Sequence, residues 1–246
     1  MLISLIINFY DKDHQCIPNM LKQLNNISFN KEVIFVDDRN DKTEDIRKLY
    51  NIPSEYKIIP SFPTGENVGT FESRRSGVLN ATGDYVWFID IDDEIYDFNP
   101  IPDGSDVICY NFKMNGKPNK RFYTNRYFTC KSYENYKYVY RFLLYGSLWR
   151  NLYLRKTLLK VYKQIPTHKH LFFYEDMFLN GYVLNNFKRI TCDTQIIYNY
   201  NMTYNYYWKE NEDKVDYMIE HSTGIAKKIL IELKSNSFMW NKIYNY

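Results

Sequence analysis

Four short apolar runs alternate with helical patterns over residues 2–93, and this alternation constrains the fold more than any other feature. The apolar runs are "LISLIIN" (2–8), "KEVIFVDD" (31–38), "YKIIPSF" (56–62) and "DYVWFIDIDD" (84–93). Apolar residues at helical spacing fall in "CIPNMLKQLNNI" (16–27), "DKTEDIRKLYNI" (41–52) and "ESRRSGVLNATG" (72–83), the last expected to close at Gly83. Strands that alternate with helices form βαβ units, so the sequence predicts an α/β fold with a mostly parallel sheet flanked by helices.

The second half of the chain predicts a more mixed pattern. Two strand-like runs at 106–112 and 120–129 are joined through "KMNGKPNK", a turn-forming stretch, which indicates a small antiparallel excursion. Residues 138–162 read as largely helical with a break at Gly146, and a helix at 172–186 precedes a strand at 189–201. An amphipathic helix is expected over 214–233.

Polar side chains gather where the predicted parallel strands end. Ligands of such sheets bind outside the carboxyl ends of the strands, which places Asn8, Asp37, Asp38 and the cluster Asp90–Asp93 along one edge. Two carboxylates ~4 Å apart repel by roughly 4 kcal/mol at an effective dielectric constant near 20. The cluster therefore predicts a bound cation, and carboxylates at a turn suit Mg²⁺ or Mn²⁺.

Charge and cysteine usage set only broad limits on the partners. The net charge is +3 in 246 residues, which permits an anionic partner without requiring one. The four cysteines form no CxxC pair, which favours a reducing compartment. No run of 18 apolar residues and no basic signal sequence is present, so we expect no transmembrane segment and a cytoplasmic protein, in the host cytoplasm if the source is viral.

A longer motif surrounds the acidic cluster. In "ENVGTFESRRSGVLNATGDYVWFIDIDD" the order is Asn67, Gly69, Arg74, Gly77, Ala81-x-Gly83-Asp84, an apolar strand and Asp90-x-Asp92-Asp93. This order resembles the inverting nucleotide-sugar glycosyltransferases of family 2, which have the GT-A fold, a Rossmann-like α/β fold. Four further segments match the family in the correct order, and they are "VIFVDD", "SLWRNLYLRKTLL", "FYEDMFL" and "IIYNYNMTYN".

The resemblance covers residues 1 to about 207 and implies one GT-A domain, with a donor half over about 1–100 and an acceptor half over about 101–207. Residues 208–246 are then a C-terminal helical extension, which we expect to pack on the domain or to form a homodimer with a second copy. The chain departs from the family at "NFYD", where Pro-x-Tyr-Asn is usual, at "VDDRND", and at Arg75, where Asn is usual.

On the donor side, the resemblance implies that Asp92 and Asp93 hold Mn²⁺ or Mg²⁺ and that Asp90 reaches the ribose or shares the metal. It also implies that Asp38 accepts a hydrogen bond from a pyrimidine base and that Arg74 faces the donor's phosphates or base. Its neighbour Arg75 is expected to be solvated. The whole set expected to bind the donor is Asn8, Asp38, Asn67, Arg74, Asp90 and Asp92.

On the acceptor side, inversion needs a base that takes the proton of the acceptor hydroxyl on the face opposite the leaving group. The resemblance assigns this role to Asp176, with Trp149, Arg150 and Glu175 as candidates for acceptor contacts. The sequence does not decide whether His168 or His170 completes the metal site.

We therefore predict an enzyme, a metal-dependent glycosyltransferase that moves a sugar from a nucleotide-diphosphate donor, with a UDP-sugar favoured, to a hydroxyl acceptor such as a surface glycan. The alternatives are a viral glycosyltransferase acting on modified DNA bases, a nucleotidyltransferase, a two-metal nuclease using Asp37, Asp90, Asp92 and Asp176, and a non-catalytic sugar-nucleotide or glycan-binding protein. A nucleotidyltransferase needs a Gly-rich loop after the first strand, and "NFYDKDHQC" contains no glycine.

Overall fold

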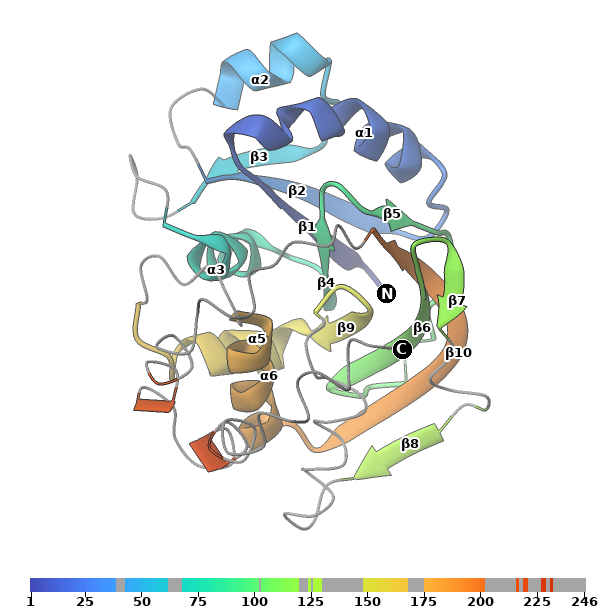
Figure 1. Ribbon diagram of the computed structural model, residues 1–246, viewed down its shortest axis with the longest axis vertical. Helices are drawn as coiled ribbons and strands as arrows, with labels where there is room; N and C mark the ends of the chain where they lie inside the picture. The colour runs from blue at the N-terminus through green and yellow to red at the C-terminus, as the bar shows by residue number, and fades with distance from the viewer. Residues whose placement is uncertain are drawn as a thin grey trace.

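A computed structural model describes residues 1–38, 43–61, 68–101, 103–119, 124, 126–129, 148–167 and 175–201, together with six positions between 216 and 231. Within these ranges a single curled sheet runs through the molecule, with helices on both of its faces (Figure 1). The α/β fold with a mostly parallel sheet flanked by helices is thereby confirmed.

The N-terminal part of the chain contributes a parallel block of four strands. They are β1 (Ile3–Phe9), β2 (Lys31–Asp37), β3 (Lys57–Pro60) and β4 (Tyr85–Asp90), in the order β3-β2-β1-β4. All three pairings in this block are parallel. The carboxyl ends of β1, β2 and β4 therefore meet at one edge of the sheet, as the sequence predicts.

The sheet continues from β4 in the order β9-β6-β10-β5. Their bounds are β9 (Asn151–Leu154), β6 (Val107–Met114), β10 (Arg189–Tyr200) and β5 (Glu94–Ile95). Strand β9 is antiparallel to both of its neighbours, β4 and β6, while β6 and β10 are parallel. The two halves of the sheet are thus joined through β9.

Alternate side chains of each central strand point to opposite faces, and each face is apolar. On β4, Trp87 and Ile89 belong to one buried cluster, while Val86 and Phe88 belong to the other. Helices α1 (Ile17–Asn25) and α2 (Thr43–Tyr50) cover the first face, after the short 3₁₀ helix η1 (Asp11–Cys16). Helices α3 (Thr70–Asn80), α5 (Arg155–Tyr162) and α6 (Glu175–Asn186) cover the second (Figure 1).

Helix α3 lies unusually close to the sheet because of Gly77. A Cβ atom built on Gly77 would lie 2.4 Å from Cγ2 of Ile6 and 3.2 Å from Cγ2 of Val36. Real Cβ atoms do not approach so closely, so only glycine permits this separation. The close approach fixes the height of α3 above β1 and thereby places Arg74, one turn earlier on the helix.

Four local expectations need correction. Residues 151–154 form strand β9 where a helix was predicted, because the backbone pairs with Tyr85–Trp87 on one side and Val107–Cys109 on the other. The hairpin partner of β6 is β7 (Lys117–Asn119), whereas β8 (Arg126–Thr129) pairs with β10. Helix α3 ends at Asn80 and not at Gly83, whose backbone N–H donates to Oγ of Ser4 at 2.9 Å.

The fourth correction concerns Arg75, which is half-buried and bound to protein groups instead of being solvated. Its side chain is 13% exposed and pairs with Glu72 at 3.3 Å. It also donates to the backbone carbonyl groups of Ile165 at 2.9 Å and Pro166 at 3.0 Å. Arg75 therefore holds the segment that follows α5 in contact with α3.

The C-terminal extension is described at only six positions, all helical and all within the predicted helix at 214–233. Ile219 packs against the buried cluster that α3, α5 and α6 share. In the described part of the chain, no helix combines the length and the hydropathy needed to span a membrane. The predicted helix break at Gly146 lies outside the described residues.

Candidate active site

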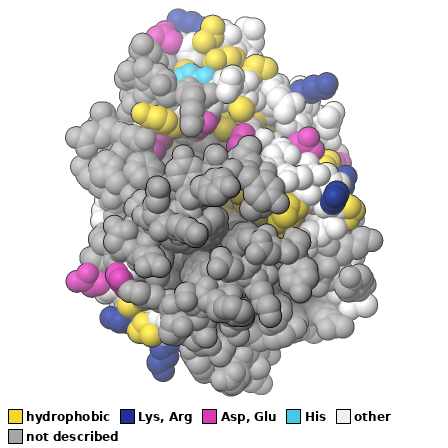
Figure 2. Space-filling view, in the orientation of Figure 1, with side chains coloured by type: hydrophobic (Ala, Val, Ile, Leu, Met, Phe, Trp, Pro, Cys, Tyr) yellow, Lys and Arg dark blue, Asp and Glu magenta, His cyan; other side chains and the backbone are white. Residues whose placement is uncertain are grey.

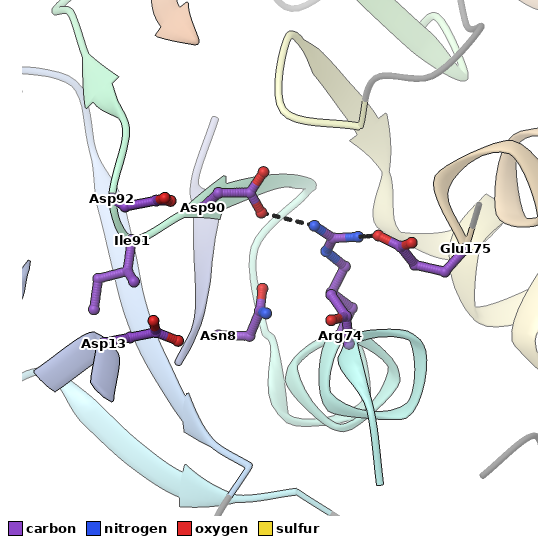
Figure 3. Close-up of a pocket in the computed structure, with 8 residues that line it drawn as sticks. Asn8, Asp13, Arg74, Asp90, Ile91, Asp92 and Glu175 are labelled. Carbon is purple, nitrogen blue, oxygen red and sulfur yellow. Dashed lines mark hydrogen bonds and ion pairs between the residues drawn. The ribbon is translucent and has the colours of Figure 1, made fainter. Parts of the chain in front are cut away.

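A cavity of about 290 Å³ opens at the carboxyl ends of β1 and β4. The pairing register sets Asn8 of β1 beside Asp90 of β4, so both side chains reach the cavity from neighbouring strands (Figure 3). Acidic side chains are also visible in the upper half of the face in the space-filling view (Figure 2). The cavity is lined by Asn8, Asp13, Thr70, Arg74, Asp90, Ile91, Asp92 and Glu175.

Arg74 joins the two halves of the domain across this cavity. Its Nη2 donates to Oδ1 of Asp90 at 2.7 Å and its Nη1 donates to Oε1 of Glu175 at 2.5 Å (Figure 3). Burial by itself lowers the pKa of Arg74, but the carboxylates of Asp90 and Glu175 raise it further than burial lowers it, so the guanidinium stays charged. Burial also raises the pKa of Glu175. The end of β4 and the start of α6 are therefore held together by one buried cation.

Asn8 presents an unused polar atom to the same space. Its Oδ1 is buried and accepts no hydrogen bond from the described residues. A buried acceptor without a donor costs about 1–3 kcal/mol, which a ligand would recover by donating to it. The expectation that Asn8 contacts the donor stays a prediction, and this atom supports it.

Asp92 and Asp13 complete the acidic side of the cavity. Burial, followed by the charge of Asp90, raises the pKa of Asp92. Asp13 lies on η1, where its Oδ2 accepts a hydrogen bond from the backbone N–H of Tyr10 at 3.0 Å. Sequence reasoning missed Asp13, because "NFYDKDHQC" departs from the family pattern and gives no signal of its own.

Asp93 is not among the residues that line the cavity. Its side chain is buried, and its two oxygens accept hydrogen bonds from the hydroxyl of Tyr198 at 2.9 Å and the backbone N–H of Asn201 at 2.7 Å. Burial, followed by the charges of Asp90 and Asp92, raises the pKa of Asp93 to about 8. The metal role expected for Asp93 stays untested, and this geometry favours Asp92 as the ligand.

The carboxylates fit a metal that is shared with a substrate better than one held by the protein alone. Among the described residues, no group of three or more His, Cys, Asp or Glu side chains is arranged to hold a metal ion. The cavity offers Asp90 and Asp92, and one oxygen of Asp90 is already bound to Arg74. Mg²⁺ is commonly bound through one or two carboxylates together with substrate phosphates, so this pair suits a metal–diphosphate complex. His168 and His170 lie outside the described residues.

Asp38 has an internal structural role. Its Oδ1 accepts hydrogen bonds from Oγ of Ser61 at 2.7 Å and from the backbone N–H of Val68 at 3.2 Å, and its Oδ2 accepts one from the N–H of Gly69 at 3.1 Å. The carboxylate thus fixes the position of Val68 and Gly69, the residues that directly precede α3. The predicted contact with a base is untested, and Asn67 lies outside the described residues.

The candidates for the acceptor side separate into two groups. Glu175 lines the cavity, and Asp176 follows it at the start of α6 with a partly exposed side chain. Trp149 and Arg150 are 8% and 4% exposed and lie in the aromatic core, where Arg150 covers the ring of Phe112. Neither lines the cavity, so the acceptor contacts expected of them are not apparent in this conformation.

The sheet, the cavity and the Asp-x-Asp-Asp segment together form an α/β domain with a polar site at the carboxyl ends of its parallel strands. The chain belongs to glycosyl transferase family 2, whose sequence profile matches residues 4–168. The predicted family is thereby confirmed.

Two curated proteins are similar to this chain. An uncharacterized glycosyltransferase of Haemophilus influenzae is 36% identical over 95 residues, which is 38% of this chain and 37% of that protein. The cholesterol galactosyltransferase of Borreliella burgdorferi is 27% identical over 223 residues, which is 76% of this chain and 60% of that protein. The chain therefore spans less than two thirds of the length of either relative.

Solved structures extend the likeness of the fold to nearly the whole chain. The crystal structure of S. aureus TarS 1–349 has a TM-score of 0.68 at 22% identity and covers 99% of this chain and 74% of that chain. The structure of the same protein in complex with UDP-GlcNAc has a TM-score of 0.68 at 23% identity, covering 97% of this chain and 73% of that chain. At this identity the likeness establishes the GT-A fold.

Proposed function

We propose that the protein is a glycosyltransferase that moves a sugar from a nucleotide-diphosphate donor to a hydroxyl acceptor with inversion. The observation that carries the proposal is the single cavity into which Asn8, Asp90 and Asp92 project from one side and Glu175 from the other (Figure 3). Family membership supports a sugar-nucleotide donor over the triphosphate of a nucleotidyltransferase or the two metals of a nuclease. A UDP-sugar is favoured, because TarS, which shares the fold, was crystallised with UDP-GlcNAc.

The donor is held at the carboxyl edge of β1 and β4. Asp92, with Asp90, would hold Mn²⁺ or Mg²⁺ together with the diphosphate. The metal, when bound, neutralises the charge that grows on the diphosphate as the glycosidic bond breaks. Arg74 keeps Asp90 and Glu175 at a fixed separation, so the donor side and the acceptor side of the cavity keep their relative position.

The acceptor enters from the side of α6. Asp176 takes the proton of the acceptor hydroxyl while the oxygen of that hydroxyl forms a bond to the anomeric carbon of the sugar. The bond from that carbon to the diphosphate oxygen breaks, and the nucleoside diphosphate leaves with the electron pair. A surface glycan is the acceptor that we propose, and a modified DNA base is the alternative.

We further propose that the protein works in the cytoplasm and that the C-terminal helix packs on its own domain. The described cysteines Cys16, Cys109 and Cys192 are free thiols, which suits a reducing compartment. The contact of Ile219 with the core supports packing within one chain over a homodimer.

The test is a binding and turnover screen. Calorimetry with UDP, GDP, ATP and a DNA duplex, each with Mn²⁺, is expected to show the tightest binding for a nucleoside diphosphate. Release of nucleoside diphosphate from a panel of UDP-hexoses is expected with Mn²⁺ and not with excess chelator. Preferential binding of ATP, or cleavage of DNA, would overturn the proposal, whereas preferential binding of the DNA duplex would favour the modified DNA base over the surface glycan as the acceptor.

A further inference from the structure

Tyr200, the last residue of β10, is held rigidly beside the acidic cluster. Its ring stacks on that of Trp149, with 5.2 Å between centroids and 10° between planes. Trp149 stacks in the same way on Tyr198, two residues earlier on the strand, at 4.7 Å and 19°. Since Trp149 is itself buried, the three rings form a fixed aromatic stack.

The residues around Tyr200 are tied to the end of β4. The hydroxyl of Tyr198 donates to Asp93 and accepts from the backbone N–H of Asp90 at 3.0 Å. On the other side, Asn201 donates its backbone N–H to Asp93. Tyr200 lies between these two anchors, so its position relative to Asp90 is set by the strand and does not depend on a flexible side chain.

The Tyr200 hydroxyl, unlike that of Tyr198, makes no hydrogen bond with the described residues. Burial raises its pKa, and the charges of Asp90, Asp93, Asp176 and Asp92 raise it further. The phenol therefore keeps its proton and remains able to donate. These carboxylates come from both the end of β4 and the start of α6, so the hydroxyl lies in the field of both sides of the site.

This position matches that of one part of the substrate. In an inverting displacement the attacking hydroxyl and the leaving diphosphate lie on opposite faces of the transferred sugar. The diphosphate is assigned to Asp92 and the base to Asp176, so the sugar lies between these two residues. Tyr200 is not among the residues that line the cavity in this conformation, but the hydrogen bonds of its neighbours Tyr198 and Asn201 to Asp93 hold it beside the end of β4.

We propose that the Tyr200 hydroxyl donates a hydrogen bond to the transferred sugar of the donor and contributes to the choice of that sugar. This inference rests on the proposed function and adds to it a residue that contacts the sugar, in contrast to the contacts with the diphosphate. Within the described chain, Tyr198 provides a matched tyrosine whose hydroxyl is already engaged by the protein.

The experiment compares Tyr200→Phe with the wild type by calorimetry in Mn²⁺, using UDP, UDP-glucose, UDP-galactose and UDP-GlcNAc as probes. Tyr200→Phe removes only the hydroxyl, so the melting temperature is expected to stay unchanged. The dissociation constant for UDP is expected to change by less than about twofold. That for the UDP-hexose that the wild type binds best is expected to rise roughly 3- to 10-fold, the value of one net hydrogen bond.

Tyr198→Phe is the control, because its hydroxyl supports Asp93. This variant is expected to melt at a lower temperature and to bind UDP and the UDP-hexose more weakly, both to the same extent. Equal weakening of UDP and UDP-hexose by Tyr200→Phe, or no weakening of either, would overturn the assignment of Tyr200 while leaving the proposed function intact. A wild type that binds none of the four probes would overturn the UDP-sugar as the donor and the assignment of Tyr200 together.

Discussion

Replacement of Arg74 by Met tests whether the buried cation holds the two halves of the site together. The variant keeps an unbranched apolar stem but leaves Asp90 and Glu175 without their shared partner. Removing one partner of a buried ion pair costs about 3–5 kcal/mol. The Asp90 side chain is 28% exposed, so water solvates part of its charge. We therefore expect the free energy of unfolding to fall by about 2–4 kcal/mol. For a chain of this size the melting temperature should fall by roughly 4–15 °C.

A double-mutant cycle isolates the pair. Arg74→Met, Glu175→Gln and the double variant are unfolded with urea at pH 7 in chelator, so that no metal contributes. The free energy of unfolding of the double variant is expected to fall by less than the sum of the decreases in the two single variants, with a coupling energy of at least about 1 kcal/mol. Arg75→Met is the matched control, since Arg75 pairs with Glu72 and should combine with Glu175→Gln additively.

Two results would refute this reasoning. One is a loss below about 1 kcal/mol for Arg74→Met, which is typical of a solvated surface pair. The other is a coupling energy that is the same for Arg74 and for Arg75, which would mean that Glu175 responds to charge on α3 in general and not to this ion pair.

Four further predictions follow from the same geometry. Asp92→Asn should abolish Mn²⁺-dependent release of nucleoside diphosphate while the melting temperature stays equal or rises, because repulsion from Asp90 is relieved; full turnover in the variant would contradict the metal role. Asp176→Asn should bind UDP normally but lose transfer by ~10²–10⁴, and retention of more than about a third of the activity would place the base elsewhere. Burial raises the pKa of Glu32, but hydrogen bonds from Lys57, Ser4 and Thr82 lower it to about 2. The charged Glu32 therefore stabilises the folded protein above the ordinary pKa of 4.5, and this stabilisation is lost as the pH falls toward 2. Glu32→Gln should make the melting temperature depend less on pH over that window, and an unchanged dependence would contradict the prediction. Gly77→Ala should cost about 1–3 kcal/mol in urea unfolding through its clash with Ile6, whereas a gain would show that helix propensity outweighs the close approach.

The parallel block of the fold was predictable, because local pattern and tertiary role agree there. The alternation of Trp87 and Ile89 with Val86 and Phe88 follows a sheet that is buried on both faces, and the sequence shows it as one continuous apolar run. Strand β9 was not predictable in the same way. "NLYL" continues directly into a helix, and only the two neighbouring strand backbones make it extended.

In the site, the residue types and the edge of the sheet were predictable, but the orientations were not. Asp92 and Asp93 are indistinguishable as letters, yet the pairing of β10 provides Tyr198 and Asn201 as donors to the carboxylate of Asp93, whereas Asn201 reaches only the backbone carbonyl group of Asp92. Likewise, Arg74 and Arg75 are adjacent, and only the docking of α5 and α6 on α3 decides that the first meets Glu175 and the second meets Ile165 and Pro166.

The central place of β9 also has a consequence for the order in which the chain folds. Until residues 151–154 are available, β4 is an open edge whose Tyr85, Val86 and Trp87 have no partner on that side. Exposed strand edges invite pairing with other chains. At about 5–20 residues per second, a ribosome needs several seconds to pass from the end of β4 to the end of β9. The nascent N-terminal half is therefore expected to be a substrate for chaperones, and a fragment that ends near residue 100 should aggregate when it is expressed alone.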